Sequence, residues 1–213
     1  MSTAFWYVLI IGLALLLLWT IGSWWVVKDI EQPDYQVLEK YDDYEIRAYE
    51  SYIVAETIVE AENEREALNE GFRIVADYIF GNNASTEKVS MTSPVLSSSE
   101  GEKISMTAPV LASDAEGRRK VAFVMPKEYS LETLPVPNDE RVMLREVPAH
   151  TVAAHRFGWY ATDARIAKKK EKLIDALTRD GIRVTSMPYY AGYNPPLTIP
   201  FIQRHEVLVN VAW

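Results

Sequence analysis

Residues Tyr44–Val59 read YEIRAYESYIVAETIV, and a related stretch, VMLREVPAHTVAAHRF, occurs again at Val142–Phe157. The two stretches lie 98 positions apart and carry an arginine, Arg47 or Arg145, at the same place. Both are rich in β-branched and aromatic residues with rough alternation, which predicts a strand, a turn and a second strand. This repeat indicates a domain that is built twice from the same unit.

A helical pattern follows each of the two stretches. Apolar residues between Leu68 and Ile79 recur at helical spacing, and Gly81 follows them; a similar stripe at Ile166–Leu177 is followed by Gly181. Further strands are expected at residues 120–125 and 206–213. Two β-α-β-β units predict an α+β domain in which a twisted antiparallel sheet, or distorted barrel, carries two main helices.

A second, shorter repeat lies between the two halves. Val89–Leu96 recurs as Ile104–Leu111 with six of eight residues identical, and a polar, Gly-containing turn separates the two runs. Two short strands joined in this way predict a hairpin, and the proline in each run predicts an edge or a kink. Met91 and Met106 take equivalent places, where they form either an adaptable apolar wall or ordinary core.

The N-terminal segment differs from the rest of the chain. Residues 1–27 contain no Asp, Glu, Lys or Arg, and the apolar run at 4–27 is long enough to span a bilayer as a helix. Aromatic residues stand at both ends of the run, as membrane interfaces favour. A cleaved signal peptide is the alternative, but its basic n-region and small-residue cleavage site are missing. The sequence predicts a single-pass membrane anchor at 4–27.

A short polar linker, residues 28–34, follows the anchor and keeps the domain at 35–213 close to the membrane. The charges that flank the anchor differ by only one or two. The positive-inside rule therefore favours a cytoplasmic domain only weakly, and the side of the membrane on which the domain lies stays open.

Composition excludes several classes of function. The chain of 213 residues contains no cysteine, which excludes disulfides, thiolate metal sites and a cysteine nucleophile. Its net charge is −8 and its pI is about 5.0, without a basic stripe, so nucleic-acid binding is not expected.

No catalytic residues are predicted, because the sequence contains no recognisable catalytic or phosphate-binding motif. The chain is therefore expected to be a binding protein rather than an enzyme. The spacing of His150 and His155 places them on opposite faces of a strand, which argues against a shared metal site. Lys168–Lys170 is either a solvated face or a site for lipid headgroups or a ligand carboxylate. The aromatic, Pro-rich segment 187–200 is either a pocket rim or loop packing.

Several motifs occur in the order found in one known family. They are VLEKYDDYEIR at 37–47, GFR at 71–73 with YIFGNN at 78–83, the twin MTSPV and MTAPV, FVMP at 123–126, LP at 134–135, YNPP at 193–196 and RHEV at 204–207. Together they resemble the SOUL haem-binding protein family over about residues 33–213. The resemblance implies two β-α-β-β repeats in an effector-binding-like fold.

The resemblance also implies non-covalent binding of haem or another tetrapyrrole in an apolar groove, as a buffer, carrier or sensor. On that basis we expect apolar walls and basic partners for the propionates. The expected wall residues are Ile46, Met91, Met106, Phe123, Met125 and Tyr193, and the expected cations are Arg47, Lys88 and Arg204.

The chain departs from the family pattern at two places. Ala48 stands where one branch of the family has a histidine that is thought to ligate iron, and His205 stands where the family usually has asparagine. His205 is therefore the predicted metal ligand. The alternative function is an apolar-ligand or protein-interaction domain that keeps the fold without haem. An enzyme acting on tetrapyrroles has no motif to support it, and the sequence identifies no protein partner.

Overall fold

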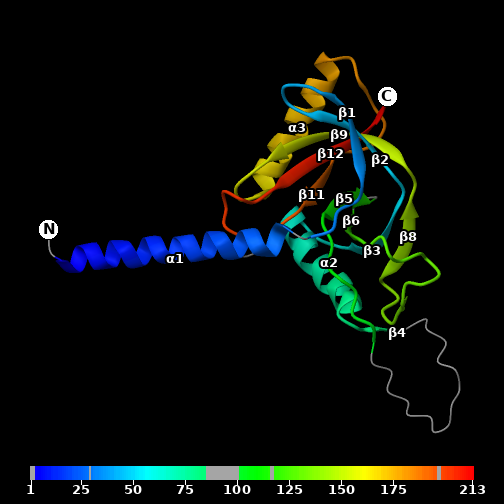
Figure 1. Cartoon of the computed structure of the whole chain (residues 1–213). Coiled ribbons are helices and arrows are strands. Elements are labelled where there is room, and N and C mark those ends of the chain that lie inside the picture. The colour runs from blue at the N-terminus through cyan, green and yellow to red at the C-terminus, as the bar shows by residue number, and fades with distance from the viewer. Residues whose placement is uncertain (1–2, 29, 85–100, 116–117, 196–197) are drawn as a thin grey trace, which may run out of the picture.

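An N-terminal helix projects from an α+β domain in this computed structural model (Figure 1). The structure describes residues 3–28, 30–84, 101–115, 118–195 and 198–213. Helix α1 covers Thr3–Lys28, and its span Phe5–Ser23 has a mean hydropathy of 2.2; within this span only Ser23, at its end, is buried. By length and composition this helix can cross a membrane, and an N-terminal signal sequence would meet the same criterion.

The domain is built around one large antiparallel sheet of ten strands, counted over the described residues. Its strands are β1 Tyr35–Lys40, β2 Glu45–Tyr49, β3 Tyr52–Val59, β5 Val110–Ala115, β6 Arg118–Val124, β8 Met143–Val147, β9 His150–Phe157, β10 Arg183–Val184, β11 Tyr189–Gly192 and β12 His205–Ala212. Two further short strands, β4 Asn83–Ala84 and β7 Val136–Pro137, pair with each other.

The strand order confirms the predicted duplication. The order is β1-β2-β9-β12-β11-β5-β6-β3-β8, with β10 paired to β12. From the central pair β11 and β5 outward, equivalent strands of the two repeats occupy equivalent places: β12 and β6, then β9 and β3, then β2 and β8. The first strand of each repeat therefore pairs with the second strand of the other repeat.

The two predicted helices are present, and each begins at a side-chain cap. Helix α2, Glu64–Ile79, begins after Asn63, whose Oδ1 accepts a hydrogen bond from the Glu66 amide at 3.0 Å. Helix α3, Asp163–Arg179, begins after Thr162, which caps it in the same way. Both helices cover the same face of the sheet.

The sheet has a different packing partner on each face. On the helix side, Ile46, Ala153 and Val209 pack with α3, while Ala55, Val121 and Phe123 pack with α2. The opposite face, which is concave, buries a layer that includes several tyrosines. Its buried members are Tyr49, Ala108, Val152, Ala154, Ala191, Tyr193 and Leu208, with Tyr35, Tyr52 and Tyr189 at the edge of the layer.

The short central repeat forms less strand than its sequence predicts. Its first copy lies outside the described residues. In the second copy strand β5 starts only at Val110, so the prediction of a strand from Ile104 is wrong for the first six residues. Their backbone groups find other partners: the Ile104 amide donates to Ile79 O at 2.9 Å, and the Ala108 amide donates to Glu31 O at 2.9 Å. Strand β5 pairs with β6 and β11.

Candidate functional site

An apolar groove of about 590 Å³ lies between α2 and the segments that flank β5 and β11. We call it the groove. Its walls include Leu68 and Phe72 from α2, Met106 and Val110 from the chain leading into β5, and Tyr190 and Tyr193 from β11 and the residue after it. The volume falls within the usual range for small-molecule sites, which are mostly apolar.

The α2 wall follows from the way in which this helix packs. Gly71 faces the sheet, and a Cβ at this position would lie 2.5 Å from Val121 Cβ, so only glycine allows so close an approach. Leu68 and Phe72 then lie at the edge of the buried face, where they are partly exposed to the groove. The Phe72 ring also packs on Phe123, with the ring centroids 5.1 Å apart.

The structure brings some predicted wall residues to the groove and places others elsewhere. Met106 and Tyr193 line it. Phe123 and Ile46 are fully buried in the core, with Phe123 directly behind the groove residue Phe72. Met125 is buried and borders a separate surface cleft near Pro126 and Tyr129. Met91, like the predicted cation Lys88, lies outside the described residues.

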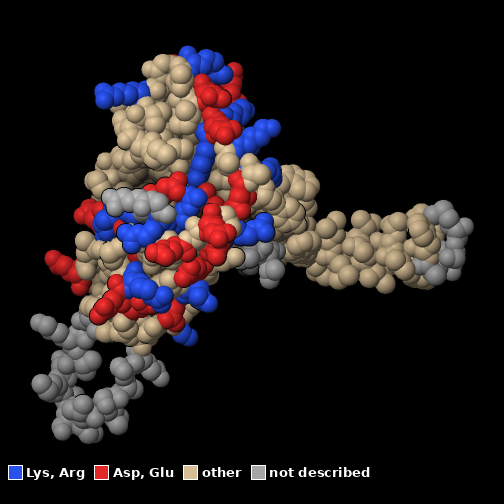
Figure 2. Space-filling view, turned by 180° about the vertical axis from the view of Figure 1, so that it is seen from behind, with Lys and Arg blue, Asp and Glu red and all other residues tan. Residues whose placement is uncertain are grey.

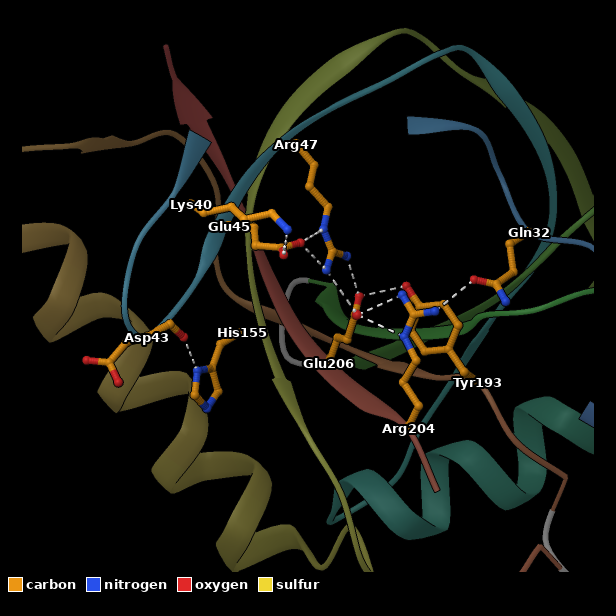
Figure 3. A network of polar contacts seen from close by, with 9 residues as sticks. All are labelled: Gln32, Lys40, Asp43, Glu45, Arg47, His155, Tyr193, Arg204 and Glu206. Carbon is orange, nitrogen blue, oxygen red and sulfur yellow. Dashed lines mark hydrogen bonds and ion pairs between the residues drawn. The ribbon is translucent and has the colours of Figure 1, made fainter. Parts of the chain in front are cut away.

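The two other predicted cations meet at one buried carboxylate (Figure 3). Arg47 Nη1 lies 2.8 Å from Glu206 Oε2, and Arg204 Nη2 lies 2.8 Å from Glu206 Oε1. The hydroxyl of Tyr193 donates to Glu206 Oε2 at 2.8 Å. The Arg204 guanidinium also stacks on the Tyr193 ring, with its carbon 3.9 Å from the ring centroid. This network fixes Tyr193, and therefore one wall of the groove.

The charges in this network balance one another. Burial by itself would raise the pKa of Glu206, but the hydrogen bond from Arg47 and the charges of Arg47 and Arg204 outweigh burial, and the net pKa lies below its usual value. Arg47 also donates from Nε to Glu45 at 3.0 Å, and Arg204 donates from Nη1 to Gln32 at 3.0 Å. Both guanidinium groups are therefore occupied within the protein.

Comparison with known proteins identifies the family. The model of the SOUL heme-binding protein family matches residues 30–100 and 97–210, which together cover most of the chain. The chain belongs to the SOUL family.

Named relatives agree with this assignment, and a solved structure shares the fold. Heme-binding protein 1 of Xenopus laevis is 28% identical over 164 residues, which cover 77% of this chain and 81% of that protein. Heme-binding protein 2 of Homo sapiens is 27% identical over 157 residues, or 73% of this chain and 72% of that protein. The crystal structure of the EcmrR C-terminal domain shares the fold, with a TM-score of 0.53, 11% identity and coverage of 84% of this chain and 98% of that domain.

In this SOUL domain, the predicted metal ligand His205 lies behind the groove wall. Its Nδ1 lies 2.7 Å from the hydroxyl of Tyr190, and its Nε2 lies 3.2 Å from Gln203 Oε1. Burial lowers the pKa of His205, so the ring is neutral near pH 7. Ligation of iron by His205 would require one of these contacts to break, and the role of His205 as a metal ligand stays a prediction.

The sequence did not single out four polar residues at or beside the groove. Asn69 and Asn194 line it, and the Nδ2 of Asn194 is buried without a hydrogen-bond partner among the described residues. Arg65 and Arg73 lie one helical turn on either side of Asn69, are exposed, and form no ion pair within the part of the chain that the structure describes. Their spacing of four residues was visible in the sequence, but exposed arginines on a helix usually indicate only a solvated face.

Proposed function

We propose that this SOUL-family protein binds haem, or a related tetrapyrrole, non-covalently in the groove. The observation that carries the proposal is the groove itself, an apolar site of suitable size bordered by α2 and by Tyr193, Asn194 and Pro195. Its relatives named heme-binding proteins point to the same class of ligand. Bound haem would supply a redox-active iron, which suits a buffer, a carrier or a sensor.

The residues present fit a tetrapyrrole by their chemistry. Phe72, Met106 and Tyr193 offer apolar and aromatic surface to a flat ring, and the thioether of Met106 can adapt to its edge. Arg65 and Arg73 lie next to the groove and form no ion pair among the described residues, so we assign the propionates to them. The unpartnered amide of Asn194 provides a further donor in the wall.

Arg47 and Arg204 take a different part in this proposal. Because both are paired with Glu206, they act through Tyr193, whose ring and hydroxyl they hold in place. Their loss would alter the groove wall without removing a free charge from the ligand.

We further propose that α1 anchors the protein in a membrane as a single pass. Its apolar surface is not buried against the domain, and Lys28 ends it at the first charge of the chain. The linker that follows is short, and the Ser23 hydroxyl accepts a hydrogen bond from the Ile199 amide at 3.1 Å. The anchor is therefore in direct contact with the domain.

A haem titration of the full chain in detergent micelles tests the ligand and its location. Met106→Glu places a charge in the groove and should weaken binding about tenfold or more, because the apolar wall cannot solvate it. Met143→Glu is the matched control, since Met143 is 44% exposed on β8 and Met106 is 42% exposed. Saturable Soret binding that is lost only in Met106→Glu supports the proposal. Equal binding by both variants would place the ligand elsewhere.

A titration without saturable haem binding would favour the alternative function over haem binding. It would exclude haem and leave an apolar-ligand or protein-interaction domain on the same fold.

A second titration isolates the role of iron. Metal-free protoporphyrin is titrated against the wild type and His205→Ala, and the result is compared with that for haem. If His205 ligates iron, His205→Ala weakens haem binding and leaves the binding of the metal-free ring unchanged.

A further inference from the structure

Three large aromatic side chains are exposed together at one corner of the domain. Trp159 and Tyr160 occupy the turn between β9 and α3, and Phe201 lies in the loop that leads into β12. They are 59%, 60% and 56% exposed. The Trp159 amide donates to Pro200 O at 3.2 Å, so the turn and the loop are in direct contact. We call these three residues the aromatic patch.

The aromatic patch lies beside the base of α1. The same loop contains Ile199, whose amide bonds to Ser23 in the last turns of the helix. Figure 1 shows the loop before β12 on the side of the domain from which α1 extends. In Figure 2 the visible surface where the helix leaves the domain is largely free of charged residues. A bilayer that contained α1 would therefore face the aromatic patch.

The turn is built to hold its tryptophan outward. Trp159 has φ 67°, the one positive value among non-glycine residues in the described part of the chain. For a bulky residue this conformation is strained and persists only where the surroundings enforce it. Arg165 enforces it, because its guanidinium donates to Tyr160 O at 2.6 Å and to Gly158 O at 3.1 Å. The Trp159 side chain remains exposed, so it adds no packing to the core that would offset this strain.

Positive charge surrounds the aromatic patch on the adjoining helix. Arg165, Lys168 and Lys169 lie in the first two turns of α3, and Lys168 is exposed without an ion pair in the described structure. Lys169 lies 5.8 Å from the Phe157 ring centroid. Aromatic side chains flanked by lysine and arginine suit the headgroup region of a bilayer that contains anionic lipid.

We propose that the aromatic patch inserts into the headgroup–acyl interface of the bilayer that α1 enters, with the cations of α3 against anionic headgroups. This inference rests on the proposed membrane insertion of α1. The docking also fixes where the groove lies relative to the bilayer. The groove is lined by Ile30, just after α1, and by Asn194 and Pro195, just before the loop of Phe201. The groove is held at the lipid surface, where it can take an apolar ligand directly from the membrane.

Spin labels on the full chain in vesicles test this docking. The chain has no cysteine, so each single cysteine carries a unique label. Phe201→Cys reports the aromatic patch, and Gly12→Cys reports the middle of α1, where an added Cβ would meet no other part of the protein within 4 Å. Val136→Cys is the control on β7, because Val136 is 57% exposed, as Phe201 is at 56%.

Collision with oxygen, which concentrates in lipid, is compared with collision with a water-soluble nickel chelate in phosphatidylcholine vesicles containing phosphatidylglycerol. We expect the labels at positions 12 and 201 to be shielded from nickel, and the label at 136 to be exposed to it. A lipid profile at position 12 with an aqueous profile at 201 would overturn the docking alone. An aqueous profile at 12 would overturn the anchor and the docking together. If Phe201→Cys does not fold, Tyr160→Cys gives the same readout.

Discussion

Arg47 and Glu206 form a buried ion pair across an intervening strand, with Nη1 of Arg47 on β2 2.8 Å from Oε2 of Glu206 on β12. The equivalent arginine of the second repeat, Arg145, instead reaches Glu56 on the adjacent strand β3, at 2.9 Å. Ala154 takes the place equivalent to Glu56 in the second repeat, so no carboxylate is available to Arg47 on β9. The repeat has therefore kept its arginine and changed the partner.

The cost of removing Glu206 should be large. Glu206→Gln leaves the partly buried guanidinium of Arg204 without a countercharge and the buried guanidinium of Arg47 with Glu45 alone, and we expect it to lower the free energy of unfolding by about 3–5 kcal/mol at neutral pH. Glu56→Gln is the control, because its partners Arg145 and Lys120 are partly exposed to water. Denaturant unfolding measures both variants. A loss in Glu206→Gln no larger than in Glu56→Gln would contradict the prediction.

The difference between wild type and Glu206→Gln should depend on pH. The pKa of Glu206 is lowered in the folded state, so its stabilising contribution is present above the unfolded pKa of 4.5 and is lost as pH falls through the folded pKa. The two unfolding free energies should therefore converge below pH 4.5. Stability curves recorded over acidic pH check this, and a constant difference would show that the charge of Glu206 is not involved.

His155 should make folding sensitive to mild acid. Its Nδ1 lies 2.5 Å from the Asp43 carbonyl, its Nε2 is buried without a partner among the residues that the structure describes, and burial lowers its pKa below 6.5. The unfolded chain binds a proton more readily, so stability is expected to fall as pH drops below 6.5. His155→Leu should show a shallower slope in the same range by thermal unfolding. Parallel slopes for the variant and the wild type would contradict this assignment.

Gly71 should be intolerant of a side chain. The Cβ of Gly71→Ala would meet Val121, and overpacking of this kind costs about 1–3 kcal/mol. Because the conflict is with one side chain, Val121→Ala should relieve part of it. A double-mutant cycle by denaturant unfolding measures the coupling, and additive losses would mean that α2 shifts to accommodate the alanine.

Arg73 should contribute modestly to haem affinity. An exposed charge pair is worth about 0.2–1 kcal/mol, so Arg73→Ala should weaken binding by about 1.5- to 5-fold, and added salt should reduce the difference. Arg118→Ala, an exposed arginine on β6 away from the groove, is the control. A Soret titration of both variants decides the question. Equal losses would remove Arg73 from the propionate assignment.

Local patterns in the sequence predicted much of the fold. The spacing of apolar residues in 68–79 and 166–177 gave helices α2 and α3, and the alternation of Val207, Val209 and Val211 gave the face of β12 that packs with α3. These patterns persist because each element buries one face. The pattern of Ile104–Pro109 predicted a strand that is absent, because the apolar residues of this segment line the groove and the core without pairing with another strand.

The site was harder to predict because it depends on contacts between distant residues. Arg47 and Glu206 are 159 residues apart, and nothing local in either segment indicates that they are paired. Arg47 and Arg204 therefore resembled free cations in the sequence. Arg65 and Arg73 resembled an ordinary solvated face, and only the position of α2 beside the groove distinguishes them.

The interleaved order of the sheet has a consequence for how the protein is made. Because β2 pairs with β9 and β8 pairs with β3, neither half of the gene encodes a unit that could close its own sheet. The ribosome must release nearly the whole chain before β12 can enter between β9 and β11, and such long-range pairing is slow. Helix α1 leaves the ribosome long before that moment, so with α1 as the membrane anchor that we propose, the nascent domain would complete its folding while already tethered.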